Sequence, residues 1–396
     1  MTSFGNKLLT FCFLVIIFGL GILSFLTPDR EVSEVENRNL AQRPDISKVS
    51  LISGDLFKGI ESYFTDQFFS RDWFIKTYTQ EQIVMGKTLI NDVVIAENNW
   101  LLFPPIQEEN RNEIIQSTTQ LKKLTDVFSK EKLEIYMALA PYKTNILMDK
   151  YPYYLNKNKG VSNQRYFLEH LPTSMEVISL YDEFINEYSK QEIDKMYFRT
   201  DHHWNIEGAF AGYQHIINRI GETSTQFSGE ARNRDDYSLA CNSNAKFVGS
   251  MNNQIYQLVN AEEDKACQLV PNNDSKMVNV TATMWDGSIV NDISQIYGTG
   301  FNKEEILYGD LFTWDLPLIQ FEFGETNNDL HLLVLKDSYT NPIQPFLAQH
   351  FKNTSIIDLR HYKEKSVEDY IRDNGVDIVL FLYNDTNLFG EMYQVQ

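Results

Sequence analysis

The chain has 396 residues, and its 54 acidic against 35 basic side chains give a formal net charge of −19 at pH 7. Binding to nucleic-acid phosphates or anionic lipid headgroups requires a cationic surface, so this charge argues against a nucleic-acid-binding protein and against peripheral docking on anionic membranes. Hydrophobic residues make up 43% of the chain, which excludes wholesale disorder. Three cysteines are too few for a disulfide scaffold, and their spacing fits no zinc module.

An apolar run without a charged residue, 8–26, follows Lys7 near the N-terminus. At 1.5 Å per residue a helix of this length spans roughly 28 Å, about the hydrocarbon thickness of a bilayer. Lys7 precedes the run and acidic residues follow it, so the positive-inside rule predicts a cytoplasmic N-terminus with the rest of the chain outside. A cleaved signal peptide is the alternative. No A-x-A-like cleavage site follows the run, and we therefore expect residues 1–27 to be an uncleaved, single-pass anchor in the cell membrane.

Residues 28–105 are predicted to form a linker and a helical entry segment. Aromatic residues recur between Leu56 and Lys76, and their spacing predicts one or two amphipathic helices that pack an aromatic face inward. The short apolar stretches around 93–103 flank the polar turn Glu-Asn-Asn and predict a hairpin.

From residue 106 onward, predicted strands alternate with predicted helices. Buried strands are expected at 133–140, 175–180, 332–335, 355–359 and 377–383, and helices at 110–130, 206–220, 342–350 and 367–374. Asn205 and Ser366 are the expected N-caps of two of these helices. Repeated strand–helix–strand units imply an α/β fold with a mostly parallel sheet and helices on both faces.

The stretch 226–330 interrupts this alternation and is predicted to be a β-rich insertion. It carries Cys241 and Cys267. A disulfide between them is chemically permitted outside the cytoplasm, but the sequence does not show whether their Cα atoms approach each other, so their pairing stays open.

Two short segments concentrate reactive side chains: Arg199–Asn205, which reads RTDHHWN, and 335–342, which reads LKDSYTNP. In the second segment a hydrophobic strand leads directly into Ser338, and Pro342 is suited to the first turn of a helix. A serine at the carboxyl end of a parallel strand is well placed to act as a nucleophile, because ligands bind at that edge and helix-terminal N–H groups stabilise an oxyanion there.

A serine nucleophile needs a base, and the base needs an acid that orients it. The pair Asp201-x-His203 supplies both, since residues i and i+2 of an extended chain project to the same side. Asp201 is then expected to bind one imidazole nitrogen, which leaves the other facing outward. Trp204 is expected to pack on the imidazole.

Each segment also has a different interpretation. A serine before a helix is often only a cap. Asp201, His202 and His203 would equally suit a metal ion, so a metal-dependent hydrolase remains open. No further His, Asp or Glu motif has ligand spacing, and we therefore expect no metal and no cofactor.

Several strings of this sequence together resemble the DHHW protein family, which is similar to the exported SGNH-hydrolase-like O-acetyltransferases of bacterial alginate and cell-wall polysaccharides. They are TDHHWN at 200–205, DSYTNPIQPFLAQHF at 337–351, VDIVLFLYN at 376–384, EVENRNLAQRPD at 34–45 and ESYFTDQFFSRDWF at 61–74. The resemblance covers nearly all of the chain after the apolar run. It implies a three-layer SGNH-hydrolase-like sandwich over 106–396.

The resemblance also implies a catalytic triad of Ser338, His203 and Asp201, with the serine after the Asp-x-His pair in a permuted order. His202 is then a neighbour and not the base. Lys336 stands where the family's Gly-Asp-Ser string has its glycine, which makes the backbone before the nucleophile less permissive. Besides the N–H of Ser338, the candidates for binding the oxyanion or the substrate are Gly309, Asn384, Tyr339, His202 and Trp204.

The expected function is that of a membrane-anchored extracytoplasmic O-acetyltransferase, which passes an acetyl group through a serine acyl-enzyme to a cell-surface polysaccharide. Because acetyl-CoA is cytoplasmic, the resemblance implies a membrane-bound O-acyltransferase partner that supplies the acetyl group, and anchorage would keep the two close. If water attacks the acyl-enzyme, the same triad makes a carbohydrate esterase. A non-catalytic polysaccharide-binding or assembly protein on this fold is a further alternative.

Overall fold

A computed structural model of the chain describes residues 3–33, 36, 38–46, 53–272, 280–324 and 326–395. Glu34, Val35 and Asn37 of the string at 34–45 therefore lie outside the described residues, as do residues 273–279 of the predicted insertion. The chain forms two compact units, one made of residues 1–91 and 253–258 and the other of residues 92–252 and 259–396.

The first unit begins with an apolar helix, α1 (Ser3–Leu26), whose segment Phe4–Leu26 is long and apolar enough to cross a membrane. A helix of this kind near the N-terminus is either a membrane anchor or a signal sequence. In the described residues, the unit also contains β1 (Val32–Ser33), β2 (Arg38–Asn39), α3 (Asp55–Asp66), α4 (Arg71–Val84) and β3 (Leu89–Ile90). β1 and β2 pair antiparallel.

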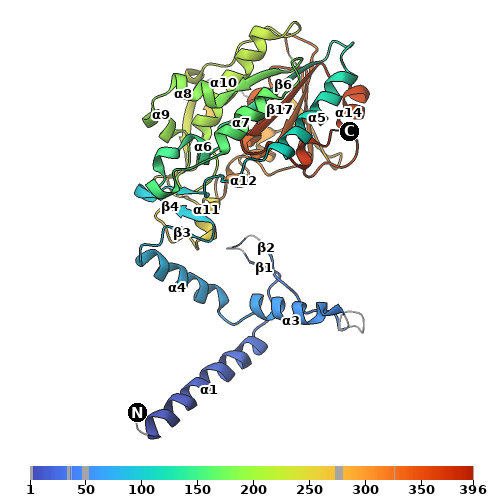
Figure 1. The fold of residues 1–396 in the computed structure, drawn as a ribbon. Helices are drawn as coiled ribbons and strands as arrows, with labels where there is room; N and C mark the ends of the chain where they lie inside the picture. Colours follow the sequence, from blue (N-terminus) through green and yellow to red (C-terminus); the bar gives the residue numbers. More distant parts are fainter. Residues whose placement is uncertain are drawn as a thin grey trace. The chain divides into compact units, whose positions relative to one another are not determined.

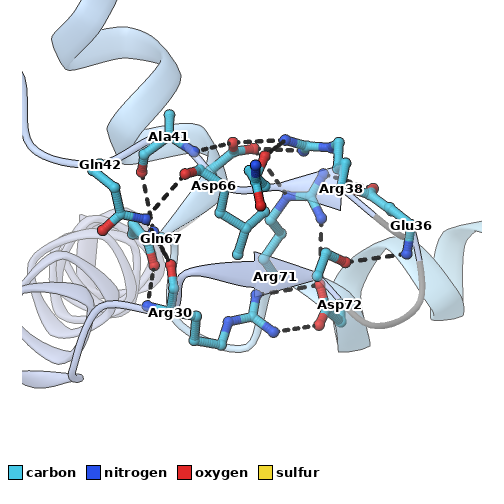
Figure 2. A network of polar contacts seen from close by, with 12 residues as sticks. Arg30, Glu36, Arg38, Ala41, Gln42, Asp66, Gln67, Arg71 and Asp72 are labelled. Atoms are coloured by element: carbon cyan, nitrogen blue, oxygen red, sulfur yellow. Dashed lines mark hydrogen bonds and ion pairs between the residues drawn. The ribbon is translucent and has the colours of Figure 1, made fainter. Parts of the chain in front are cut away.

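A network of charged and amide side chains ties the segment around β1 and β2 to α3 and α4 (Figure 2). Asp66 at the end of α3 accepts two hydrogen bonds from Arg38, at 2.7 and 2.8 Å, and one from the N–H of Ala41 at 2.8 Å. The hydrogen bond from Arg38 lowers the pKa of Asp66 to about 2 despite the opposing effect of burial. Gln67 binds the N–H and the C=O of Arg30 at 2.9 and 2.8 Å, as a neighbouring strand would.

The two predicted helices of the entry segment are present as α3 and α4, but the prediction that their aromatic face packs inward was wrong. Phe57 is 65% exposed, Phe64 50% and Trp73 61%. The buried positions include Asp66 and Gln67 instead, because this small unit places its polar network inside. An amphipathic pattern alone does not show which of its two faces is covered.

The second unit holds the strands and helices predicted from residue 106 onward, preceded by the predicted hairpin (Figure 1). Its first half contains β4 (Val93–Ile95), β5 (Leu101–Leu102), α5 (Arg111–Val127), β6 (Glu134–Ala140), α6 (Lys143–Ile146), α7 (Gly160–Glu169), β7 (Glu176–Ser179), α8 (Leu180–Glu187), α9 (Lys190–Lys195), α10 (Ile206–Thr223), β8 (Tyr237–Cys241) and β9 (Lys246–Phe247). After α11 (Ser250–Gln254) come β10 (Cys267–Pro271), β11 (Val280–Met284), β12 (Ile289–Val290), β13 (Glu305–Ile306), α12 (Tyr308–Leu311), β14 (Leu318–Phe323), β15 (His331–Lys336), α13 (Gln344–Ala348), β16 (Asn353–Ile357), α14 (Val367–Asn374) and β17 (Ile378–Asn384).

The central sheet has the strand order β12-β11-β14-β16-β15-β17-β6-β7. The five strands from β16 to β7 are parallel to one another, and β14, β11 and β12 add an antiparallel edge. Successive residues of β17 alternate between two hydrophobic cores: Leu380 packs in the core that contains Phe210 of α10, and Phe381 in the core that contains Leu121 of α5. The sheet is thus covered on both faces, and the α/β sandwich with a mostly parallel sheet is confirmed.

The described strands of the stretch 226–330 fall into three groups. β11, β12 and β14 extend the central sheet, β8 and β10 form a separate antiparallel pair, and β9 and β13 form a short parallel pair. Cys241 and Cys267 face each other across that pair and form a disulfide, so the pairing that the sequence left open is present. The buried Val280 and Phe321 explain why one part of this stretch joins the main sheet.

Candidate active site

The carboxyl ends of β6, β15 and β17 meet at one edge of the sheet, because these strands are parallel and adjacent. Asp337 and Ser338 follow β15 directly, and a 3₁₀ turn (Ser338–Ile343) begins at the serine and leads into α13. The helical segment therefore starts earlier than the sequence predicted. Asp337 causes this, since its Oδ1 accepts the N–H of Tyr339 at 2.9 Å and caps the turn.

The loop that reads TDHHWN brings its side chains to the same edge. Ser338 Oγ lies 2.8 Å from His203 Nε2, and His203 Nδ1 lies 2.7 Å from Asp201 Oδ1. Asp201 and His203 are buried, whereas Ser338 is only partly covered. The structure therefore brings together the three residues that the sequence singled out, in a continuous chain of hydrogen bonds.

Asp201 is held by further donors. Its Oδ1 accepts the N–H of His203 at 3.0 Å, and its Oδ2 accepts the N–H of Ser250 at 2.7 Å. Burial by itself would raise the pKa of this carboxyl, but the imidazoles of His203 and His202 and these hydrogen bonds hold the pKa well below its usual range. An ionised Asp201 favours the His203 tautomer with its proton on Nδ1, which leaves Nε2 to accept the hydroxyl proton of Ser338.

Tyr308, which the sequence analysis missed, packs on the imidazole. Its ring is stacked on that of His203, with centroids 3.7 Å apart and an angle of 7° between the planes, and its hydroxyl donates to the C=O of Ser338 at 3.0 Å. Among the ring contacts of the described residues, Trp204 packs on Tyr339, with centroids 5.2 Å apart, and not on the imidazole as predicted; its indole N–H donates to the C=O of Tyr339 at 2.9 Å. The rings in contact with His203 are those of His202, Tyr308 and Tyr339.

The remaining candidates occupy different places around the site. His202 Nδ1 lies 2.8 Å from Ser250 Oγ, and burial with the adjacent His203 lowers the pKa of His202 to about 3. The hydroxyl of Tyr339 donates to the C=O of His202 at 2.6 Å. His202 thus lies beside the proposed base and is braced by Tyr339.

Asn384 and Gly309, two of the oxyanion candidates, are engaged in other contacts. Asn384 donates its N–H and its side-chain amide to Asp337 Oδ2 at 2.7 and 2.8 Å. A Cβ on Gly309 would lie 2.5 Å from the Trp314 ring, so close packing requires glycine there. These contacts give both residues a structural role, whereas the N–H of Ser338 stays the candidate carried by the nucleophile itself.

A buried lysine braces the loop that carries Asp201 and His203. The ammonium group of Lys143 donates to the C=O groups of Leu101, Arg199 and Asp201 at 2.7, 2.8 and 2.8 Å, which uses all three of its protons. Burial lowers the pKa of Lys143 to about 7. Neither its position in the sequence nor its neighbours indicate this role, because the carbonyl groups come from strand β5 and from a distant loop.

The side chain of Lys336, which stands where the family has its glycine, is held by polar groups. Its ammonium group binds Asp315 at 2.7 Å and Asn341 at 2.8 Å and is buried. The lysine is therefore accommodated by its own polar pocket.

The residues of the metal interpretation also lie close together, since ligand atoms of Asp201, His202 and His203 are within 4.8 Å of one another. In the described structure, however, the two ring nitrogens of His203 face Asp201 and Ser338. This arrangement matches a serine nucleophile with its base, in which both nitrogens are already used.

Replacement of Tyr308 by phenylalanine is expected to lower kcat about fivefold, because it removes one hydrogen bond of about 1 kcal/mol to the backbone of Ser338 and keeps the stacked ring. Tyr308→Ala is expected to lower kcat about 100-fold, because the imidazole loses the ring that fixes the orientation of its plane. Steady-state hydrolysis of p-nitrophenyl acetate measures both values. Equal losses in the two variants would contradict a role for the ring.

The buried carboxyl group of Asp385, next to Asn384, should make the free energy of unfolding depend on pH. Its Oδ1 accepts from the N–H of Tyr142 and the side chain of Asn145, whereas its buried Oδ2 has no hydrogen-bond partner in the described structure. Burial raises the pKa of Asp385 to about 7, so the folded state retains a proton that the unfolded state has already lost. The wild type therefore loses stability as the pH rises from about 4 to about 7.

The variant Asp385→Asn cannot ionise and is expected to lack this component. The difference in unfolding free energy between variant and wild type should move in favour of the variant by a few kcal/mol between pH 4 and pH 8. Denaturant unfolding at several pH values measures it. Parallel pH profiles for the two proteins would show that Asp385 titrates normally.

The geometry can be compared with known proteins. The family model described as "SGNH hydrolase-like domain, acetyltransferase AlgX" matches residues 93–287. The structure of PatB1 from Bacillus cereus is 40% identical, with a TM-score of 0.71, and the alignment covers 77% of this chain and 99% of PatB1. PatB1 with a sulfonyl adduct matches with 38% identity, a TM-score of 0.70 and coverage of 78% and 99%.

A DHHW family protein from Eubacterium siraeum shares the fold, with 18% identity, a TM-score of 0.56 and coverage of 77% of this chain and 94% of that protein. No curated protein matches the chain in sequence. Because the 40% identity extends over almost the whole of PatB1 and the family model matches the same unit, the chain belongs, like PatB1, to the SGNH hydrolase-like acetyltransferase family.

Proposed function

We propose that this protein is a membrane-anchored, extracytoplasmic O-acetyltransferase that carries the acetyl group on Ser338 and transfers it to a hydroxyl group of a polysaccharide. The observation that supports this most directly is the chain of hydrogen bonds from Ser338 through His203 to Asp201. Membership of an acetyltransferase family supports acetyl as the group that is transferred. The apolar helix α1 supports the location of the protein at the membrane.

In the first half-reaction His203 Nε2 takes the proton from Ser338 Oγ, which attacks the carbonyl carbon of the acetyl donor. The tetrahedral oxyanion forms near the N–H of Ser338 at the start of the 3₁₀ turn, where backbone donors stabilise negative charge. His203 then returns the proton to the leaving group, and the acetyl ester of Ser338 remains. Asp201 stabilises the imidazolium form throughout.

In the second half-reaction a sugar hydroxyl gives its proton to His203 and attacks the ester. His203 then returns the proton to Ser338 Oγ as the ester bond breaks, which restores the free serine and leaves the sugar acetylated. Water in the same position would make the protein an esterase, so exclusion of water and binding of the acceptor decide between the two products. We propose that a membrane-bound O-acyltransferase delivers the acetyl group outside the cell and that the anchor keeps the two proteins together. These steps use protein groups only and require no cofactor.

PatB1 is recorded with a sulfonyl adduct. Sulfonyl fluorides react covalently with activated serines, so the same reagents offer a direct test here. Phenylmethylsulfonyl fluoride should label Ser338 of the full chain, as located by peptide mass spectrometry, and should not label Ser338 in a His203→Ala variant. The exposed Ser162 provides a matched control, because Ser162→Ala should leave labelling unchanged.

The choice between transferase and esterase requires an acceptor. Full-length protein is incubated with p-nitrophenyl acetate and oligosaccharides of the cell surface, and acetylated sugar and free acetate are both quantified. A transferase produces acetylated sugar at the expense of acetate as acceptor is added. Acetate alone at every acceptor concentration would indicate an esterase, and turnover of neither kind with retained glycan binding would indicate a binding protein.

A further inference from the structure

The first unit carries an apolar surface that the proposed chemistry does not use. We call it the aromatic ridge: Phe57, Ile60 and Phe64 of α3 with Trp73 and Phe74 of α4, whose exposed fractions run from 41% to 65%. Soluble proteins rarely leave large apolar side chains gathered in this way, and such patches usually mark an interaction site. The ridge therefore requires an occupant.

The part of the aromatic ridge on α3 occupies one face of that helix. Phe57, Ile60 and Phe64 follow one another at spacings of three and four residues, which places them on a single side of the helix. Asp66, on another side of α3, is buried in the polar network with Arg38. The polar side of α3 is thus covered by contacts within the unit. The apolar side stays exposed in the described structure and is available to a partner outside the unit.

The rings of the ridge are also continuous with one another. Phe64 contacts Phe68, Phe68 contacts Phe74, and Phe74 contacts Trp73, with ring centroids 5.6, 6.0 and 4.9 Å apart. These contacts carry the apolar surface of α3 across the turn to the first residues of α4. The surface is a single strip that ends in an exposed tryptophan.

Phe64, in the middle of the strip, lies against the apolar helix α1. A shallow groove of about 450 Å³ is lined by Phe64 and by residues of α1 between Ile17 and Leu26. In addition, the N–H of Phe69 donates to Ser24 Oγ at 2.9 Å. The contact therefore lies within the apolar length Phe4–Leu26 and not beyond its end.

These contacts determine which occupant fits. If α1 crosses the membrane, a side chain that packs between Ile17 and Leu26 is at the depth of the outer acyl chains. We infer that α3 lies in the outer leaflet of the membrane, with Phe57, Ile60 and Phe64 among the acyl chains and Trp73 at the level of the headgroups. The inference rests on the anchor of the proposed function and adds a second, lipid-facing element to it.

The side chains of α3 are consistent with a neutral lipid surface. The helix carries Asp55, Glu61 and Asp66 against a single Lys58, so electrostatic attraction to anionic headgroups does not contribute. Aromatic side chains such as Trp73 favour the membrane–water interface, where the ring is apolar and the N–H stays hydrated. Insertion should therefore occur in zwitterionic bilayers.

The test uses the full chain in phosphatidylcholine nanodiscs. Cys12 is first replaced by serine, and a single cysteine is introduced as Phe57→Cys or Ile60→Cys and labelled with the environment-sensitive dye NBD. Ser62→Cys is the matched control, because Ser62 is exposed on the opposite side of the same helix. We expect dyes at positions 57 and 60 to be quenched by nitroxides on the acyl chains and protected from iodide, and the dye at 62 to show the reverse.

Equal quenching by iodide at positions 57, 60 and 62, without quenching from the acyl chains, would overturn the inference and would point to a protein occupant. Intact mass of the same sample shows whether α1 is retained. A chain cleaved after α1 contradicts the anchor itself, whereas iodide quenching with α1 intact contradicts only the lipid-facing role of α3. The readout needs no acetyl transfer, so its failure is distinct from a failure of the proposed chemistry.

Discussion

Replacement of Ser338 by alanine is expected to abolish turnover, with a loss of at least about 10³-fold and up to about 10⁶-fold in kcat. The hydroxyl removed is the atom that forms the acetyl ester, and its 2.8 Å contact with His203 Nε2 is the point at which the proton leaves. Hydrolysis of p-nitrophenyl acetate and transfer to an oligosaccharide are to be measured together. Both should fall, because both require the same acyl-enzyme.

The fold should survive this change. Ser338 is only partly buried, so its hydroxyl contributes little to the core, and the melting temperature of Ser338→Ala should stay within a few degrees of the wild type. Turnover at the wild-type rate in the folded variant would disprove a serine mechanism. Loss of activity with EDTA together with indifference to Ser338 would favour the metal interpretation of Asp201, His202 and His203 instead.

The second large effect is expected for Asp201→Asn, which should lower kcat by about 10⁴-fold. Asparagine keeps the size of the side chain and can still accept the N–H of Ser250, although its NH2 group no longer accepts the N–H of His203 as Oδ1 does. Its amide donates to His203 Nδ1, however, where the carboxylate accepts. The proton then sits on Nε2, which can no longer accept the proton of Ser338.

A tautomer effect has a signature that a structural effect lacks. The thermal stability of Asp201→Asn should change little while kcat falls, and Asp201→Glu, which restores an acceptor, should recover part of the lost activity. The KM for p-nitrophenyl acetate should stay near the wild-type value, since Asp201 is buried behind His203. A kcat within tenfold of the wild type would show that His203 does not depend on Asp201.

Two parts of the candidate site were predictable because each depends on a short segment of the chain. The spacing of Asp201 and His203 allows one side chain to bind the other, and a hydrophobic strand that ends at Ser338 places it at the edge of a parallel sheet. The strands β6, β15 and β17 are continuous hydrophobic segments, a pattern typical of strands that are buried on both faces. These features depend on local sequence, whereas the contact between Ser338 and His203 joins two distant segments and depends on the fold.

Tyr308 and Lys143 show what local sequence does not contain. Tyr308 reaches His203 from a four-residue helix that lies far along the chain, and Lys143 binds carbonyl groups of strand β5 and of the loop that carries Asp201. Any of the chain's tyrosines or lysines has the chemistry to make such contacts. Only the path of the backbone selects which one does, so no spacing in the sequence identifies them.

The sequence by itself determined the alternation of strands and helices, the apolar N-terminal helix and the Asp-x-His pair, because periodicity and adjacency are properties of a linear chain. The tertiary structure decided which face of α3 stays exposed, that Cys241 pairs with Cys267, and that β11, β12 and β14 extend the central sheet. Each of these depends on which distant surface covers a given face. That choice is a balance of burial over the whole chain, and no single segment encodes it.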